Sequence, residues 1–147
     1  MKKILPSTYF MLCLTMLVAM HFIYPLKRLI SHPYIYIGLV PIVFGIIINV
    51  WADCLFKKEK TTVKPIEMPM VLITYGPFRL SRHPMYFGMA AILIGTSILL
   101  GSLTIFIFPL IFIILIQILF IPAEEKNLEE IFGGKYFDYK KKTRCWL

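Results

Sequence analysis

The sequence predicts an all-α integral membrane protein with four transmembrane helices and a cytoplasmic amphipathic helix near its C-terminus. The 147 residues are 59% hydrophobic and only 16% charged, and their mean hydropathy is +0.76. A soluble domain of this size would need more charge to cover its core, whereas lipid accepts apolar side chains. We expect the whole chain, residues 1–147, to form a single membrane-embedded domain.

Four apolar stretches have the length of a membrane span. They cover about residues 4–24, 34–55, 85–103 and 104–121. Each approaches the roughly 20 residues that cross about 30 Å of hydrocarbon. We expect helices because backbone polar groups in lipid need partners within their own segment. Gly101 and Ser102 are the only break between the last two stretches, which predicts a tight antiparallel hairpin.

The sequence changes character after the fourth stretch, at Pro122. Proline suits the first turn of a helix, and Glu124 and Glu125 suit the positive N-terminal end of one. A pair of glycines then predicts its end, so we expect a helix over about 122–132. Its apolar stripe places it on the membrane surface or beneath the bundle. That stripe consists of Leu128, Ile131 and Phe132.

Basic residues are distributed unequally over this predicted topology. With four spans, 14 of the 16 lysines and arginines share the side that holds both termini, and only Lys27 and Arg28 lie opposite. The positive-inside rule places that side in the cytoplasm. The net charge of +8 is therefore explained by topology and anionic headgroups rather than by a nucleic-acid partner. From the small size we expect a prokaryotic plasma membrane.

The three cysteines do not predict a disulfide framework or a metal site. They are odd in number and scattered along the chain, without a C-x-x-C pair. We therefore expect them to be small apolar residues within helices, and we expect no bound metal.

Polar residues gather at the cytoplasmic ends of the predicted hairpin. Arg79, Arg82 and His83 precede the third span, and Glu124 and Glu125 follow the fourth. An antiparallel hairpin brings both groups to the same depth. A carboxylate beside an apolar bundle needs a cation, which an arginine or the ammonium or sulfonium of a ligand supplies. Because such residues also occur at membrane boundaries without a ligand, their position alone leaves both interpretations open.

The segment from Tyr75 to Gly88 reads YGPFRLSRHPMYFG. It resembles the R-H-P-x-Y-x-G signature of the isoprenylcysteine carboxyl methyltransferase family, which is grouped with phospholipid N-methyltransferases. A second half of the signature follows, and the resemblance extends from about Tyr34 to the C-terminus. This half consists of Glu124-Glu125, then F-G-x-x-Y-x-x-Y from Phe132 to Tyr139, then T-x-C-W ending at Trp146.

The resemblance implies a pocket for S-adenosylmethionine at the cytoplasmic face, closed by the C-terminal tail. Glu124 would contact the amino group of the ligand, and Arg82, or alternatively Arg79, would position an anionic group of the substrate. The implied cofactor-binding residues are Met70, Val71, Leu72, Ile73, Phe78, His83, Pro84, Met85, Tyr86 and Glu124. No G-x-G-x-x-G motif follows a strand, so a Rossmann-type methyltransferase is excluded.

The expected acceptor is a lipid-like or lipidated molecule that carries a carboxylate or an amine. Prenylcysteine enzymes carry an arginine shortly before the acidic motif, where this chain has Phe120. A prenylated protein C-terminus is therefore not specifically supported.

Two alternative functions fit the same motif. One is an NADPH-dependent membrane reductase of the sterol type, which shares R-H-P-x-Y, and the other is a non-catalytic membrane adaptor. The chain is short for such a reductase, and Glu124 and Glu125 favour a cationic ligand over a polyphosphate.

Overall fold

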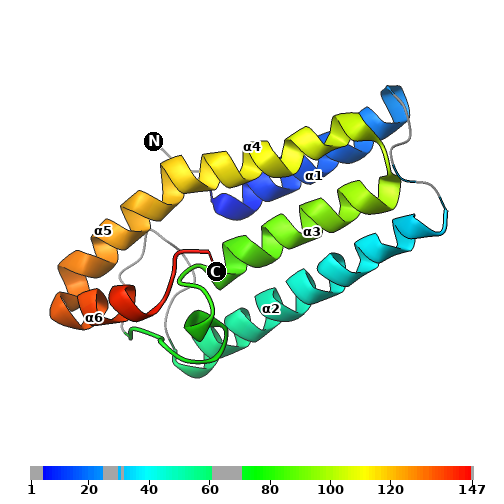
Figure 1. The fold of residues 1–147 in the computed structure, drawn as a ribbon. Coiled ribbons are helices and arrows are strands. Elements are labelled where there is room, and N and C mark those ends of the chain that lie inside the picture. The colour runs from blue at the N-terminus through cyan, green and yellow to red at the C-terminus, as the bar shows by residue number, and fades with distance from the viewer. Residues whose placement is uncertain (1–4, 25–29, 31, 61–70, 147) are drawn as a thin grey trace.

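The computed structural model describes residues 5–24, 30, 32–60 and 71–146, and every helix or strand element within them is a helix. Four apolar helices run alternately up and down in one bundle (Figure 1). They are α1 (Pro6–Ile23), α2 (Leu39–Lys58), α3 (Pro84–Leu100) and α4 (Ile107–Leu115). A 3-10 helix precedes α2 (Tyr34–Gly38) and another precedes α4 (Leu103–Phe106). The predicted all-α fold is confirmed.

Three helical segments have the length and composition of a membrane span. They are Pro6–Ile23, Tyr34–Lys58 and Leu103–Phe132. The remaining apolar helix, α3, has 17 residues and lies alongside the others in the bundle (Figure 1). The chain is thus an integral membrane protein, while a fourth full span stays a prediction.

The hairpin of α3 and α4 turns within two residues. Gly101 ends α3 with a φ of 68°, a left-handed conformation that glycine adopts without steric cost. The next residue, Ser102, is fully buried, and the chain then returns antiparallel to α3 (Figure 1). As a result, the residues before α3 and those after α4 lie at the same end of the bundle. We call this end, where α2 also finishes, the charged end.

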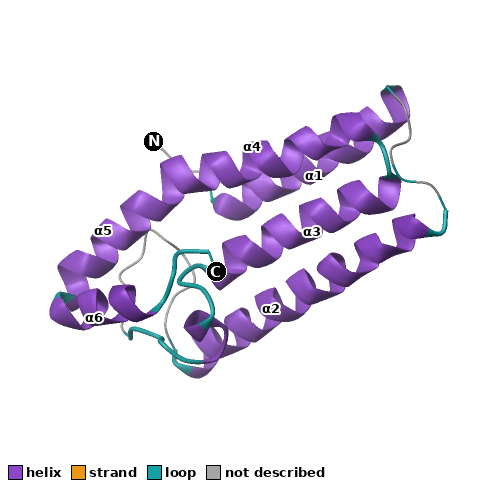
Figure 2. Cartoon of the chain, in the orientation of Figure 1, coloured by secondary structure: helices purple, strands orange, loops and turns teal. Residues whose placement is uncertain are grey.

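The region after α4 differs from the prediction in two ways. The helix predicted from Pro122 is α5 (Ile121–Phe132), but it continues from α4 through a π-helical turn at Ile116–Phe120. Proline cannot donate the backbone hydrogen bond of a continuing α-helix, and this wider turn lies directly before it. A further helix, α6 (Gly134–Lys142), was not predicted, and it folds back beside α5 (Figure 2).

The glycine pair explains why α6 was missed. Gly133 ends α5 with a φ of 50° and at once begins the turn into α6. Two glycines were interpreted only as a helix end, whereas here the positive φ reverses the chain direction between two helices. The single C-terminal amphipathic helix of the prediction is therefore corrected to two.

Helices α2 and α3 approach so closely that their backbones touch. A Cβ atom added at Gly45 would lie 2.4 Å from the carbonyl oxygen of Gly88, and one at Gly38 would lie 2.4 Å from that of Gly95. Gly38, at the end of the 3-10 helix, and Gly45 on α2 are seven positions apart, as are Gly88 and Gly95 on α3, so each pair shares one face. Small residues of this kind let helix backbones meet in a membrane protein. The contact fixes the end of α2 beside the start of α3.

A small apolar cluster anchors the loop before α3 to α2. Ile73 and Phe78 pack on Ala52 and Leu55, and all four side chains are buried. A larger cluster fills the space between α1, α3 and α4 and includes Cys145 and Trp146 at its edge. The two clusters hold the loop and the C-terminal tail on the charged end.

Candidate active site

The hairpin brings the arginine–histidine motif and the double glutamate together. His83 precedes Pro84 at the start of α3, and Glu124 and Glu125 lie in the first turns of α5. His83 Nδ1 is 3.2 Å from Glu124 Oε2, and His83 Nε2 is 3.6 Å from Glu125 Oε1. Only 4% of the His83 side chain is exposed. The structure thus has the juxtaposition that the hairpin predicts, while the roles assigned to these residues stay predictions.

Glu125 is the centre of a cluster of cations. Arg82 Nη1 lies 2.9 Å from Glu125 Oε1, and Lys140 Nζ on α6 lies 2.9 Å from Glu125 Oε2. The Arg82 contact is short but not aligned as a hydrogen bond, and the His83 contact at 3.6 Å is too long for one, so both are mainly electrostatic. His83, Lys140 and Arg82 together lower the pKa of Glu125 to about 2, against the opposite effect of burial. Glu125 is therefore an anion at any physiological pH.

The two carboxylates also determine the charge of His83. Burial acts to lower the pKa of His83, but Glu124 and Glu125 outweigh it and raise that pKa above its ordinary value of 6.5. The imidazole is thus biased toward its protonated form. Its ring stacks on Tyr86, with the ring centroids 5.6 Å apart and the planes 11° apart.

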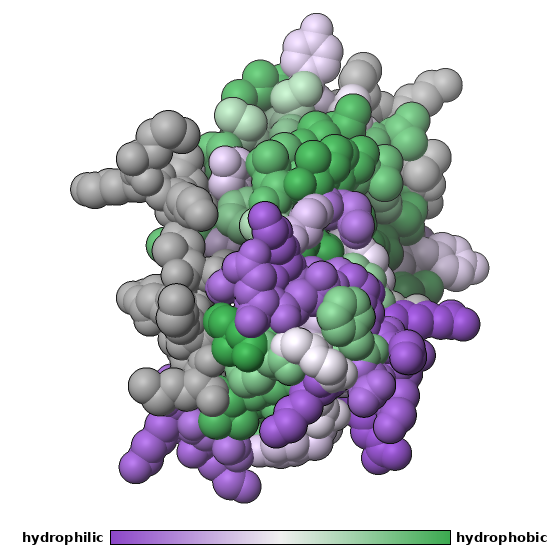
Figure 3. Space-filling model, turned by 90° about the vertical axis from the view of Figure 1, so that its left-hand side faces the viewer, coloured by the Kyte–Doolittle hydropathy of each residue, from purple (hydrophilic) through white to green (hydrophobic). Residues whose placement is uncertain are grey.

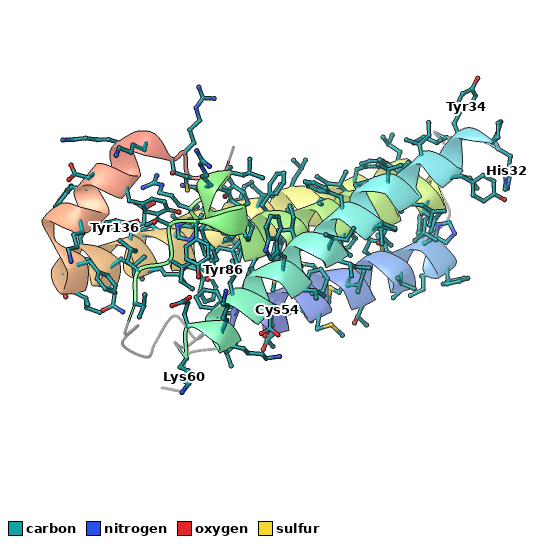
Figure 4. All side chains as sticks on the ribbon, turned by 90° about the horizontal axis from the view of Figure 1, so that it is seen from below. His32, Tyr34, Cys54, Lys60, Tyr86 and Tyr136 are labelled. Carbon is teal, nitrogen blue, oxygen red and sulfur yellow. The ribbon has the colours of Figure 1, made fainter. Side chains whose placement is uncertain are left out.

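A pocket opens between the end of α2, the loop before α3 and the start of α5. Its cavity volume is about 50 Å³, well below the roughly 300–1,000 Å³ of small-molecule sites, so these walls enclose only part of such a ligand. Tyr86, which lines it, points into the bundle, and Tyr136 lies on the inner side of α6 (Figure 4). The lining residues are Phe56, Phe78, Arg82, His83, Pro84, Met85, Tyr86 and Glu124.

The pocket combines carboxylate and aromatic surfaces. Glu124 Oε2 is buried and has no hydrogen-bond partner among the described residues. The rings of Phe56 and Phe78 meet edge to face, with centroids 5.3 Å apart. A carboxylate oxygen beside aromatic faces attracts a cation. This arrangement therefore suits a ligand that carries positive charge.

Most of the residues predicted to bind a cofactor lie at this pocket. Arg82, predicted to position a substrate, also lines it. Ile73 packs beneath the pocket in the cluster that holds Phe78, whereas Val71 is exposed and Leu72 is half-buried outside the lining. Met70 lies outside the described residues. The predicted cofactor residues that line the pocket are Phe78, His83, Pro84, Met85, Tyr86 and Glu124.

Sequence reasoning missed two side chains of this site. Phe56 lines the pocket from the last turns of α2, just beyond the predicted second span of about 34–55. Lys140 binds Glu125 from α6, a helix that was not predicted. The only signal for Phe56 was its place directly after the second apolar stretch, at the predicted cytoplasmic side.

The C-terminal tail covers the loop before α3. The Arg82 backbone N–H donates to the Arg144 carbonyl at 3.0 Å, and the Ser81 hydroxyl donates to the Cys145 carbonyl at 2.8 Å. Trp146 Nε1 donates to Gln117 Oε1 at 2.6 Å, which fastens the tail to the π-helical turn. The tail thus helps to hold Arg82 and His83 in place.

Cys145 adds a sulfur atom to the cluster. The donor atoms of His83, Glu125 and Cys145 all lie within 4.8 Å of one another. Arg82 and Lys140 contact the same carboxylate at 2.9 Å, and their positive charges oppose a metal cation there. Burial also raises the pKa of the Cys145 thiol, which disfavours the thiolate that binds metals.

Relatives of this chain are methyltransferases by name. The family described as phospholipid methyltransferase matches residues 33–135. A probable protein-S-isoprenylcysteine O-methyltransferase of Oryza sativa subsp. indica is 34% identical over 120 residues, covering 76% of this chain and 60% of that protein. The protein-S-isoprenylcysteine O-methyltransferase of Saccharomyces cerevisiae is 38% identical over 83 residues, which are 52% of this chain and 32% of that protein.

A solved structure has the same fold. The eukaryotic intramembrane Ras methyltransferase called isoprenylcysteine carboxyl methyltransferase superposes with a TM-score of 0.67 and 23% sequence identity. The match covers 96% of this chain and 51% of that chain. This chain therefore spans about half of that structure, just as it spans 60% of the length of the rice protein.

Proposed function

This chain belongs to the phospholipid methyltransferase family, and we propose that it transfers a methyl group from S-adenosylmethionine to an acceptor in the membrane. The observation that carries the proposal is the pocket in which His83 and Glu124 lie among aromatic side chains. The proposed acceptor is a lipid-like or lipidated molecule with a carboxylate or an amine.

The pocket has the chemistry that this methyl donor requires. When bound, S-adenosylmethionine supplies a methyl group that its positively charged sulfur already activates. We assign its amino group to Glu124, whose buried Oε2 accepts no hydrogen bond from the described residues and has only the ionic contact with His83 at 3.2 Å. Phe56, Phe78 and Tyr86 provide aromatic faces for a cation. Met70, Val71, Leu72 and Ile73 stay predicted contacts for the remainder of the donor.

The other residues of the site hold the side chains around the pocket in place and align the acceptor with the methyl donor. Glu125 contacts both Arg82 and His83, and this attraction keeps both side chains beside the pocket. Alignment and exclusion of water are the main requirements of methyl transfer from an activated donor. Among the residues described here, Arg82 Nε has no hydrogen-bond partner, whereas Nη1 faces Glu125 in the ion pair. We assign to Arg82 the positioning of an anionic group on the acceptor.

The charge of His83 bears on which acceptor atom is methylated. An anionic oxygen needs no base before it attacks, whereas an ammonium group must first lose a proton. His83 has a raised pKa and so is a weak candidate for accepting that proton at neutral pH. The site therefore favours a carboxylate acceptor over an amine.

We place the site at the cytoplasmic face of a prokaryotic plasma membrane. Hydrophilic side chains gather on the charged end (Figure 3). Among the described residues, lysines and arginines at this end belong to α2, the loop before α3, α5, α6 and the tail. The positive-inside rule then orients the charged end toward the cytoplasm.

Transfer of a labelled methyl group tests this proposal. Detergent-purified full chain is incubated with S-adenosylmethionine carrying an isotopically labelled methyl group and a total membrane extract. We expect label in a membrane-soluble product, which mass spectrometry identifies, and little label with Glu124→Gln. Glu130→Gln is the matched control on α5, because that side chain is 66% exposed and does not line the pocket. Absence of labelled product with the wild-type chain would refute the proposal.

A further inference from the structure

A second cavity, of about 500 Å³, opens on the charged end between α6 and the loop before α3. Its walls come from two segments that are far apart in the sequence. Thr74 and Arg79 contribute from the loop. Lys135, Asp138, Lys142 and Thr143 contribute from α6 and the residue after it.

A buried tyrosine fixes the two walls of this cavity relative to each other. The Tyr139 hydroxyl donates to the carbonyl of Phe78 at 2.5 Å, and only 8% of Tyr139 is exposed. Tyr139 also lines the cavity, so this bond holds α6 against the turn that carries Arg79. Thr143 is likewise buried, at 7% exposure. The cationic side chains of the cavity thus extend from a helix and a turn that these buried residues hold together.

The charges around the cavity differ from those of the candidate active site. Arg82 and Lys140 both contact Glu125. In contrast, Arg79, Lys135 and Lys142 form no ion pair with any acidic side chain in the described part of the chain. Asp138 is the only carboxylate among the described lining residues, so three cations face one anion.

We propose that this cavity binds a phosphate group. Lysine and arginine donate charge-assisted hydrogen bonds to phosphate oxygens, and the hydroxyls of Thr74 and Thr143 are additional donors. The cavity lies on the charged end, where we expect basic side chains to meet anionic headgroups. The phosphate belongs to a lipid headgroup or is free in solution, and both sources present the same oxygens.

This binding is separate from methyl transfer. The two cavities lie on either side of the turn Gly76–Arg79, because Phe78 lines the active-site pocket and Arg79 lines the second cavity. A phosphate held at Arg79 therefore does not depend on the proposed methyl donor. Failure of one proposal leaves the other intact.

Binding of short-chain phosphatidic acid to the detergent-purified full chain tests the proposal. Dioctanoyl phosphatidic acid and inorganic phosphate are titrated separately by thermophoresis, with dioctanoylglycerol as the ligand that lacks phosphate. We expect the wild-type chain to bind phosphatidic acid and not dioctanoylglycerol. The double variant R79Q/K142Q weakens binding roughly 25-fold, since each cation contributes about fivefold. Removal of the opposing carboxylate in Asp138→Asn tightens binding.

The control variant is Lys141→Gln, on the same helix but outside the cavity. Its affinity should stay within about twofold of the wild type, and all variants should keep the wild-type melting temperature, since these side chains lie at the surface. If inorganic phosphate displaces dioctanoyl phosphatidic acid, a free phosphate group is sufficient for binding to the cavity. If it does not, the lipid headgroup is the ligand. An equal loss in Lys141→Gln, or no binding of either probe to folded wild-type chain, would overturn the proposal.

Discussion

His83 and His21 lie at opposite ends of the helical bundle, and their surroundings differ. At the charged end, His83 lies between Glu124 and Glu125 and has a raised pKa. At the opposite end, His21 Nδ1 hydrogen-bonds the hydroxyl of Ser102 at 2.9 Å, beside the turn between α3 and α4. His83 thus belongs to a network of charges, whereas His21 forms one hydrogen bond with a neutral hydroxyl.

This difference shows that residue type alone does not identify a site in a membrane protein. Burial of either imidazole requires a hydrogen-bond or ionic partner. Only at the charged end do cations, carboxylates and a pocket converge, because two helix ends, α6 and the tail all meet there. The neighbours of a histidine, rather than its depth, indicate a ligand site.

The largest expected effect is the loss of the anion at the centre of the charged end. Glu125→Ala leaves Arg82 and His83 without their shared carboxylate, so we expect it to lower the free energy of unfolding by about 3 kcal/mol. Glu129→Ala removes only a partly exposed contact with Lys140 and should cost less than about 1 kcal/mol. Unfolding in detergent measures both. Equal losses would show that Glu125 does not organise the charged end.

A second substitution tests the helix contact that holds Phe56 beside His83. Gly45→Ala places a methyl group 2.4 Å from the Gly88 carbonyl oxygen. We therefore expect the free energy of unfolding to fall by about 2 kcal/mol and S-adenosylhomocysteine to bind more weakly. Gly134→Ala is the control, because no atom lies within 4 Å of its added Cβ. Its effect on the melting temperature should be close to zero. A harmless Gly45→Ala would mean that α2 and α3 are more loosely packed than described.

The third prediction concerns pH. The raised pKa of His83 means that its protonated form stabilises the fold, so this contribution is complete below its ordinary pKa of 6.5 and is lost as pH rises through the folded value. The contribution of Glu125 is present above its ordinary pKa of 4.5 and is lost as pH falls through about 2. We expect the melting temperature of the wild type to fall more than that of His83→Asn between about pH 6 and pH 9. Parallel curves would contradict the charged state of His83.

The smallest effect is expected at the opposite end. His21→Ala removes one hydrogen bond to Ser102, and we expect it to lower the free energy of unfolding by about 1 kcal/mol. Binding of S-adenosylhomocysteine should be unchanged, because His21 does not line the pocket. Thermal unfolding and a ligand titration on the same preparation give both values. A loss of ligand binding would show that the two ends are coupled.

The fold and the meeting of His83 with Glu124 were predictable because local rules determine both. Apolar stretch lengths predict the helices, and the two-residue break at Gly101 and Ser102 forces the hairpin that aligns the motifs. Neither inference requires knowledge of which side chains pack together. The prediction was correct where a short connection, as between α3 and α4, allows only one arrangement of the two helices.

The remaining parts of the site depend on tertiary packing and were not predictable. Phe56 reaches the pocket only because the glycine contacts hold α2 against α3. Lys140 reaches Glu125 only because Gly133 reverses the chain, a conformation that two adjacent glycines permit but do not require. Val71, Leu72 and Ile73 were all inferred from a motif alone, and of these three the packing of the loop places Ile73 in the buried cluster that holds Phe78.

Binding of S-adenosylhomocysteine tests the central claim most directly, that the charged end forms a pocket for a cationic methyl donor around Glu124. The ligand shares the amino group of the donor, and its affinity is measured by calorimetry with wild type, Glu124→Gln and Glu130→Gln. We predict that Glu124→Gln weakens binding of S-adenosylhomocysteine at least tenfold, or by about 1.4 kcal/mol, while Glu130→Gln binds it like the wild type. Wild-type affinity in Glu124→Gln would contradict the account.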